Sequence, residues 1–230
     1  MKLFSLSKYF SIALILLFVA PVYAQVADGN ATNDASYTKT ITARADKIVA
    51  ALGITDSVKY KHVQSIIVDQ YRNLSQVHDT RNAQVKDIKT QAGDDKAGAT
   101  AKIKAIDDDV DAKLTKMHTE YLAKLAIDLN VAQIDKVKDA MTYNILGVTY
   151  KAYTDEVLTL TDVQKAQIKA WLIEAREIAI DAESSEKKHA VFTKYKGRIN
   201  NYLSAQGYDM KKEAAEWEAR RNAAVAAPKQ

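Results

Sequence analysis

Apolar residues recur at steps of three and four positions along most of the chain, which is the spacing of one face of an α-helix. The stripe is clearest over 63–88 and again over 103–125, and glycines and aspartates at 93–98 interrupt it between these stretches. Two long helices joined by a short turn pack against each other in antiparallel directions. The pattern therefore predicts a long helical hairpin over about 56–127.

Shorter helices are predicted on both sides of this hairpin. One precedes it over about 37–52 and ends at Gly53, where the apolar pattern stops. Beyond it, Asn130 and Thr161 can each cap a helix, because Gln133 and Gln164, three residues further on, can bond back to the amide of the cap. Each pair is a capping box and predicts a helix start.

The remaining segments also have a helical pattern. A helix from Thr161 runs to about 182, a second from Ser184 runs to about 205 and ends at Gly207, and Asp209 caps a final amphipathic helix. No stretch of useful length alternates between apolar and polar residues as a strand does. We therefore expect an all-α helical bundle in which the hairpin packs on, or projects from, a C-terminal helical half.

The first residues have the three parts of a secretory signal peptide. Lys2 and Lys8 give a basic start, an apolar run covers 10–20, and small residues lead to Ala24. A helix that spans a bilayer needs about 20 apolar residues, so this run is too short to serve as an anchor. We expect a signal peptide over 1–24, cleavage after Ala24, and a periplasmic or secreted protein that does not span a membrane.

Two further segments lack helical periodicity. Residues 25–35 and 223–230 are small, polar and aperiodic, and we expect both to be disordered. A single all-α domain over 36–222 remains, and the roughly 206 residues left after cleavage are enough to bury a core.

Composition narrows the chemistry. The chain has no cysteine, which excludes disulfides, thiol catalysis and thiolate metal sites. Cleavage would remove two lysines and leave 31 basic against 29 acidic side chains, with the two signs interleaved along the helices. Nucleic-acid binders usually carry a concentrated basic face, so we expect no nucleic-acid partner. The pattern leaves the oligomeric state open.

The histidines do not predict a metal or cofactor site, because no zinc-binding spacing such as HExxH occurs. Pairing of the hairpin around its turn places His118 opposite Asn73, about 7.5 Å along the axis from His78, which is loose for two ligands of one ion. No nucleophile elbow, P-loop or dinucleotide fingerprint is present. We predict no catalytic residue, and the question of an enzyme stays open because carboxylate pairs need no motif.

Aromatic and polar side chains gather in the second half of the chain. Rings pack on apolar CH faces, and arginines, asparagines and carboxylates bind hydroxyls or acids, so such a set suits a sugar or peptide ligand. The alternative is that the rings belong to the core and the charges pair with one another. The candidate ligand-binding residues are Tyr143, Tyr150, Trp171, Arg176, Glu177, Asp181, His189, Lys196, Arg198, Asn200, Asn201 and Tyr202.

Two parts of this set are informative on their own. Tyr143, Tyr150 and Tyr153 would share one face of an unbroken helix, but Gly147 lies between them and leaves that stripe open. The asparagine pair at 200–201 lies inside a predicted helix, where asparagine is unfavourable, so we expect tertiary contacts to reward it. The pair either bridges to loop carbonyls or lines a ligand site.

Five segments, at 141–143, 148–153, 171–177, 184–189 and 194–203, together resemble an uncharacterised family of secreted bacterial proteins, the domain of unknown function 3826. The resemblance covers about 37–220 and is most specific in KYKGRINNYL at 194–203. It implies export and the metabolic setting of bacteria that degrade plant polysaccharides, pectic ones included. It supplies no catalytic residues.

A weaker similarity is to periplasmic stress chaperones of the Spy and CpxP type, which are small helical cradles with repeated Leu-Thr-x-x-Gln motifs. LTDVQ at 160–164 matches this motif, and LNVAQ at 129–133 departs from it at the second position. Both stretches coincide with the capping boxes, so helix-start chemistry accounts for them equally well.

Three hypotheses for function follow. The first is a binding or accessory protein in polysaccharide use, with an oligosaccharide or a protein as partner and the basic residues of the candidate set pairing with acidic groups. The second is a chaperone-like or protein-interaction module that uses the apolar faces of the hairpin. The third is a lyase or hydrolase that acts on acidic polysaccharide through Glu177, Asp181 or His189.

Overall fold

The computed structural model describes residues 31–226, and every regular element in this range is an α-helix. This confirms the prediction of an all-α fold. The expected signal peptide at 1–24 lies outside the described residues. The helices are α1 (Ala31–Ala50), α2 (Ser57–Gln91), α3 (Lys96–Leu125), α4 (Val131–Met141), α5 (Ile145–Glu156), α6 (Asp162–Ala179), α7 (Ser185–Ala205) and α8 (Met210–Ala226).

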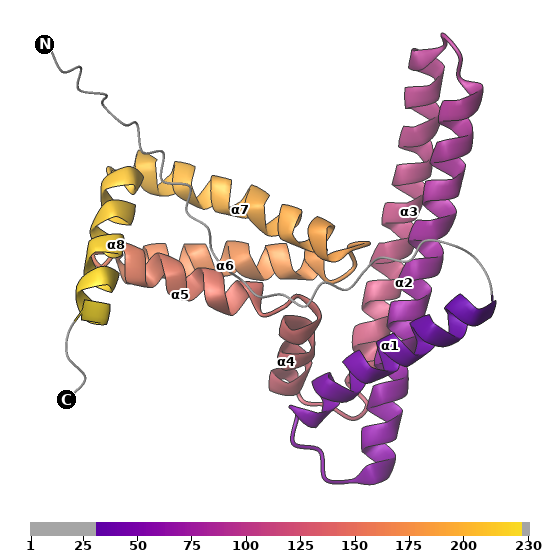
Figure 1. The fold of residues 1–230 in the computed structure, drawn as a ribbon, viewed down its shortest axis with the longest axis horizontal. Coiled ribbons are helices and arrows are strands. Elements are labelled where there is room, and N and C mark those ends of the chain that lie inside the picture. The colour runs from indigo at the N-terminus through magenta and orange to yellow at the C-terminus, as the bar shows by residue number, and fades with distance from the viewer. Residues whose placement is uncertain (1–30, 227–230) are drawn as a thin grey trace, which may run out of the picture.

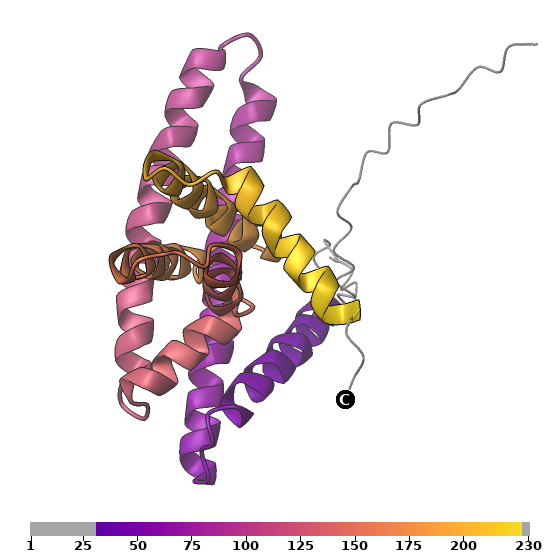
Figure 2. The same ribbon diagram turned by 90° about the vertical axis from the view of Figure 1, so that its left-hand side faces the viewer.

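The antiparallel hairpin of α2 and α3 is the longest feature of the molecule (Figure 1). Helix α1 packs along the lower part of α2, and α4 lies near that same end. Helices α5 to α8 form a second group, in which α6 and α7 run side by side toward the middle of the hairpin. The turn end of the hairpin extends past the other helices in both views (Figures 1 and 2), so the hairpin packs at its base and projects at its turn.

Two groups of buried apolar side chains correspond to these two parts. The first core lies among α1, α2, the end of α3 and α4, and it contains the fully buried Val49, Val63 and Leu125. The second core lies among α5, α6 and α7 and contains Leu172 and Phe192. Burial of a side chain of this size stabilises the folded state by about 1.5–3 kcal/mol, so each group holds its own helices together.

Both expected capping boxes are present. Asn130 Oδ1 accepts the amide of Gln133 at 2.9 Å, and Gln133 Oε1 accepts the amide of Asn130 at 3.2 Å. Thr161 and Gln164 pair in the same way, at 3.2 and 2.9 Å. Gln133 also donates through Nε2 to the carbonyl of Leu52 at 3.3 Å, so this cap ties the α3–α4 turn to the α1–α2 turn.

The helices extend further toward both ends than the sequence pattern indicated. Helix α1 begins at Ala31 and α8 reaches Ala226, so residues 31–35 and 223–226 are helical where we expected disorder. Lengthening an existing helix avoids the cost of nucleating a new one. The negative charge of Asp34, in the first turn of α1, also interacts favourably with the positive end of the helix dipole. These residues carry no apolar stripe, which is why periodicity missed them.

The tyrosine stripe that Gly147 left open does not form. Tyr143 precedes α5, with a left-handed backbone at a φ of 57°, whereas Tyr150 and Tyr153 lie within the helix. Gly147 sits inside α5 without breaking it. A Cβ at this position would lie 2.6 Å from Oδ1 of Asn144. The glycine therefore makes room for the asparagine that begins the helix.

Candidate functional site

The buried carboxylate of Asp181 lies where the two parts of the molecule meet. Asp181 follows α6, and its Oδ2 is 2.7 Å from Nδ1 of His118 on α3. Its Oδ1 accepts a hydrogen bond of 3.4 Å from Gln70, and its main-chain carbonyl accepts one of 2.8 Å from Nε2 of His78. Three side chains of the hairpin therefore hold one residue of the C-terminal half.

Glu177, one turn earlier on α6, extends this network. Its Oε2 lies 3.4 Å from Nε2 of His118, and its Oε1 lies 2.9 Å from Nζ of Lys138 and 3.2 Å from Nη2 of Arg176. Burial would raise the pKa of Glu177, but hydrogen bonds from His118 and Lys138 outweigh it and lower the pKa to about 2. Hydrogen bonds to Asp181 and Glu177 raise the pKa of His118 to about 9, against the effect of burial.

Arg176 is buried rather than displayed to solvent. Its Nη1 donates to Asp139 at 2.7 Å, and its Nη2 donates to Asp135 at 2.6 Å, both on α4. Charge-assisted contacts of this length are the strong ones among protein hydrogen bonds. The guanidinium therefore fastens α6 to α4.

Lys188 fixes the same turn from the side of α7. Its Nζ donates to the main-chain carbonyl of Ile180 at 2.7 Å. Burial lowers the pKa of Lys188 to about 8, although the charge of Asp181 acts in the opposite direction. Ile180 itself is fully buried in the first core, so the residues after α6 are held by the hairpin and by α7 together.

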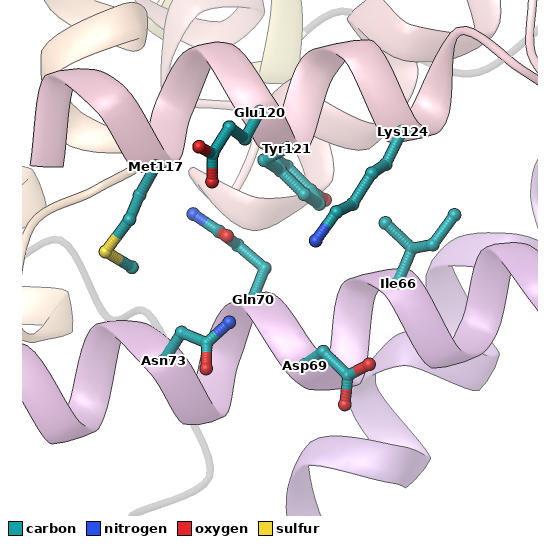
Figure 3. Close-up of a pocket in the computed structure, with 8 residues that line it drawn as sticks. All are labelled: Ile66, Asp69, Gln70, Asn73, Met117, Glu120, Tyr121 and Lys124. Carbon is teal, nitrogen blue, oxygen red and sulfur yellow. The ribbon is translucent and has the colours of Figure 1, made fainter.

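The hollow beside this network is small. A cavity of about 60 Å³ lies between α2 and α3, and Figure 3 shows its lining side chains projecting from both helices. One water needs about 10–15 Å³ of such space, so the cavity suits a few waters and no sugar. Its lining residues are Ile66, Asp69, Gln70, Asn73, Met117, Glu120, Tyr121 and Lys124.

A second group of candidate residues lies on the open face of α6 and α7. The ring of Trp171 meets that of Tyr202 edge to face, with centroids 5.2 Å apart and an interplanar angle of 88°. The guanidinium carbon of Arg198 lies 4.6 Å from the centre of the Trp171 ring, and Nη1 of Arg198 lies 3.4 Å from Glu174. Arg198 and Glu174 are both about half exposed, whereas the rings of Trp171 and Tyr202 are partly buried against the second core.

Tyr143 and His189 form a third, separate contact. Their rings are nearly parallel, with centroids 6.0 Å apart and an interplanar angle of 8°. Tyr143 precedes α5 and is 51% exposed, and His189 is exposed near the start of α7.

The remaining candidate residues are spread along α5 and α7. Tyr150 is half-buried against the second core. Asn200 accepts a hydrogen bond of 2.6 Å from the hydroxyl of Tyr153, so it bridges to α5 rather than to a loop carbonyl. Lys196 and Asn201 are exposed on α7. The structure thus divides the twelve residues among several places rather than gathering them in one site.

Several residues of the junction were absent from our candidate set, among them His118, Gln70 and Lys138. Hairpin pairing placed His118 about 7.5 Å along the axis from His78, but it could not show that both reach Asp181. No sequence spacing signals a contact between residues 63 or 103 positions apart. Across 31–226, no group of three or more histidines and carboxylates is arranged to hold a metal ion.

Comparison with known proteins gives a family but no activity. Residues 38–223 match the family described as "Protein of unknown function (DUF3826)". A search of curated proteins found no match. In the part of the chain that the structure covers, no helix is both long and apolar enough to cross a bilayer.

Proposed function

The chain belongs to this family, and because the family's description assigns no activity, we propose from the geometry that it is an exported binding protein for acidic oligosaccharides. The observation that carries the proposal is the contact of Trp171 with both Arg198 and Tyr202, in which Arg198 is half exposed and the two rings are partly buried against the second core. Tryptophan, tyrosine and arginine are the residue types that dominate binding energy at recognition surfaces. Here all three are in contact on one face.

Arg198 supplies the charge that an acidic ligand needs. Its carboxylate contact with Glu174 is long, at 3.4 Å, and both side chains are about half exposed. An exposed pair of this kind contributes about 0–1 kcal/mol, so the carboxylate of a sugar acid can replace Glu174 at little cost. A guanidinium also matches a carboxylate through two parallel hydrogen bonds. The rings of Trp171 and Tyr202 add apolar surface for the CH groups of a sugar.

The junction network argues against Glu177 and Asp181, two of the three residues in the lyase or hydrolase hypothesis, as a catalytic base. Both ring nitrogens of His118 face carboxylates, and a pKa of about 9 keeps this histidine protonated at neutral pH, so it cannot accept a proton. Glu177 faces three cationic side chains and has a pKa of about 2, which makes it a weak base. Asp181 is buried within the same contacts.

The polysaccharide setting and the location outside the cytoplasm are supported by the sequence rather than by the geometry. The resemblance to secreted bacterial proteins favours both, and the basic, apolar and small-residue order of 1–24 favours export. An exported protein that binds acidic sugars is suited to capture fragments of acidic polysaccharide outside the cytoplasm.

Calorimetric titration of residues 25–230 with acidic and neutral plant oligosaccharides tests the proposal. We expect acidic oligosaccharides to bind and Arg198→Ala to weaken binding by about tenfold or more, since a hydrogen bond to a charged group contributes about 1.5–3 kcal/mol. Arg221→Ala is the matched control, because Arg221 lies over the ring of Trp217 on α8 in a similar way, at 4.9 Å. Equal weakening by both variants, or no binding by the unaltered chain, contradicts the proposal.

A second candidate function, a protein-interaction module, has support from the base of the hairpin. Val58, Ile127 and Val131 are between 74 and 78% exposed there. The hydrogen bonds from Gln133 to Leu52 and from His62 to Asp128 bring the segments that carry these three apolar residues to the same end of the molecule. Suppression of the aggregation of an unfolded client protein, lost when Val131 is replaced by Asp, tests this function. A chain that suppresses no aggregation rules it out.

A further inference from the structure

Tyr143 occupies a left-handed backbone conformation that, in the described residues, is otherwise adopted by three glycines and by the neighbouring Asn144. Its φ is 57°, and that of the following Asn144 is 53°. The other positive φ angles in the described residues belong to Gly53, Gly93 and Gly207. Residues other than glycine and asparagine are disfavoured in this conformation, because their Cβ approaches the following carbonyl oxygen.

The local geometry is that of a helix end at which glycine is the preferred residue. Tyr143 follows the last residues of α4, its amide donates to the carbonyl of Ala140 at 3.3 Å, and the next amide donates to the carbonyl of Asp139 at 2.7 Å. These bonds close the helix, and the position that Tyr143 takes is the one where glycine is strongly enriched. The fold itself therefore has no need of a tyrosine here.

Burial does not explain the tyrosine either. Its side chain is 51% exposed, in contrast to Tyr153 and Tyr121, which are almost fully buried. Its ring contact is with His189, which is itself exposed. Strained residues persist where the surrounding structure holds them for a purpose other than stability, and they cluster at ligand contacts.

We propose that Tyr143 and His189 form a second binding site, which takes the flat face of a sugar ring. Two nearly parallel rings with open surface offer the apolar face against which the CH groups of a sugar pack. The choice of a sugar as the ligand rests on the proposed function, whereas the strain at Tyr143 does not. From this left-handed position, the ring of Tyr143 meets that of His189 on α7.

This site is distinct from the cluster around Arg198. His189 and Arg198 are nine positions apart on α7, which is about two and a half turns and places them on opposite sides of the helix. A ligand that contacts Arg198 and Trp171 therefore does not reach His189 across the same face. Loss of one site is expected to leave the other intact.

Three variants at Tyr143, measured by thermal unfolding, separate strain from binding. We expect Tyr143→Gly to unfold at or above the midpoint of the unaltered chain, because glycine relieves the left-handed strain. We expect Tyr143→Ala to unfold at a lower temperature than Tyr143→Gly, which reverses the usual order of these two residues. Tyr143→Phe keeps the ring and serves as the control. A midpoint for Tyr143→Gly below that of Tyr143→Ala overturns the proposal.

Binding is followed by NMR titration of the mature chain with short acidic and neutral plant oligosaccharides. We expect shifts at residues around Tyr143 and His189, and about tenfold weaker binding at these residues in Tyr143→Gly and His189→Ala, with Tyr143→Phe unaffected. Shifts near Arg198 that persist while those near Tyr143 are absent overturn this site alone. No shift anywhere in the unaltered chain overturns the proposed function together with the ligand assigned to this site.

Discussion

At the scale of single residues, the charges around Asp181 decide how the two parts of the molecule meet. Asp181 accepts from Gln70 and His118 through its carboxylate and from His78 through its carbonyl. A buried carboxylate without such partners would destabilise the folded state, so the contribution of each of these side chains to stability depends on the presence of the others. The junction is therefore a cooperative unit rather than a set of separate contacts.

The shifted pKa values of this unit predict how stability depends on pH. His118 has a folded pKa of about 9, above its ordinary value of 6.5, so its contribution is fully present below pH 6.5 and is lost as the pH rises through 9. Glu177 has a folded pKa of about 2, below its ordinary 4.5, so its contribution is present above pH 4.5 and is lost as the pH falls through 2. Stability between pH 4.5 and 6.5 is expected to be flat with respect to both groups.

Denaturant unfolding of the unaltered chain and of His118→Gln across pH 5 to 10 checks this prediction. The advantage of the unaltered chain is expected to shrink between pH 6.5 and 9. Lys188 has the opposite effect on stability. Its folded pKa of about 8 lies below the ordinary 10.5, so the cost of burying its charge is relieved as the pH rises from 8 to 10.5. The difference between the two chains removes this shared effect, and a difference that stays constant with pH contradicts the assignment.

At the scale of elements, helix starts are fixed by local chemistry. The boxes at Asn130 and Thr161 satisfy amides that no other part of their helices can reach. Asp95 caps α3 in a similar way, since its Oδ1 accepts a hydrogen bond from the amide of Gly98 at 2.8 Å. Gly98 therefore belongs to the first turn of α3 rather than to the break before it, where the sequence pattern placed it.

Substitution at Thr161 tests the contribution of one capping box. Thr161→Ala removes the acceptor for the amide of Gln164 and is expected to lower the free energy of unfolding by about 1 kcal/mol. Lys169→Ala, on the exposed face of α6, is the control, because alanine is the better helix former and no contact of a cap is lost. Urea denaturation of both variants supplies the comparison, and an equal effect of the two speaks against the cap.

At the scale of the whole molecule, two cores share one polar junction. Within the described residues, the first core contains one fully buried residue from beyond α4, Ile180. The side chains of Glu177, Asp181 and Glu183 make polar contacts with the hairpin. Small polar interfaces between parts of a chain favour relative motion more than large apolar ones do. The angle between the hairpin and the α6–α7 pair thus depends on a small number of side chains.

The projecting end of the hairpin is expected to be the least protected part of the described chain. Around 86–102, α2 and α3 have mainly each other as neighbours, and Val85 is the buried residue nearest the turn (Figure 1). Local opening is easiest where few apolar contacts are lost. Native-state hydrogen exchange is expected to show faster exchange at 86–102 than at 63–77, although both stretches are helical. Equal protection in the two stretches contradicts this expectation.

The sequence by itself determined the elements. Steps of three and four residues, the turn at 93–98 and the two capping boxes are local signals, because helices form from bonds between near neighbours, and the structure confirms the all-α fold with its long hairpin. The helical extensions at both ends were missed since they carry no stripe.

Only the tertiary structure decided which candidate residues meet. Arg176 and Glu177 are neighbours of Trp171 in sequence, yet they contact α4 and the hairpin, while Trp171 packs beside Arg198 on α7. Tyr143 was a candidate by residue type, but its left-handed backbone appears in no pattern of apolar spacing. Side chains that are distant along the chain come together through the packing of whole helices, and that packing depends on every core residue at once rather than on any local spacing.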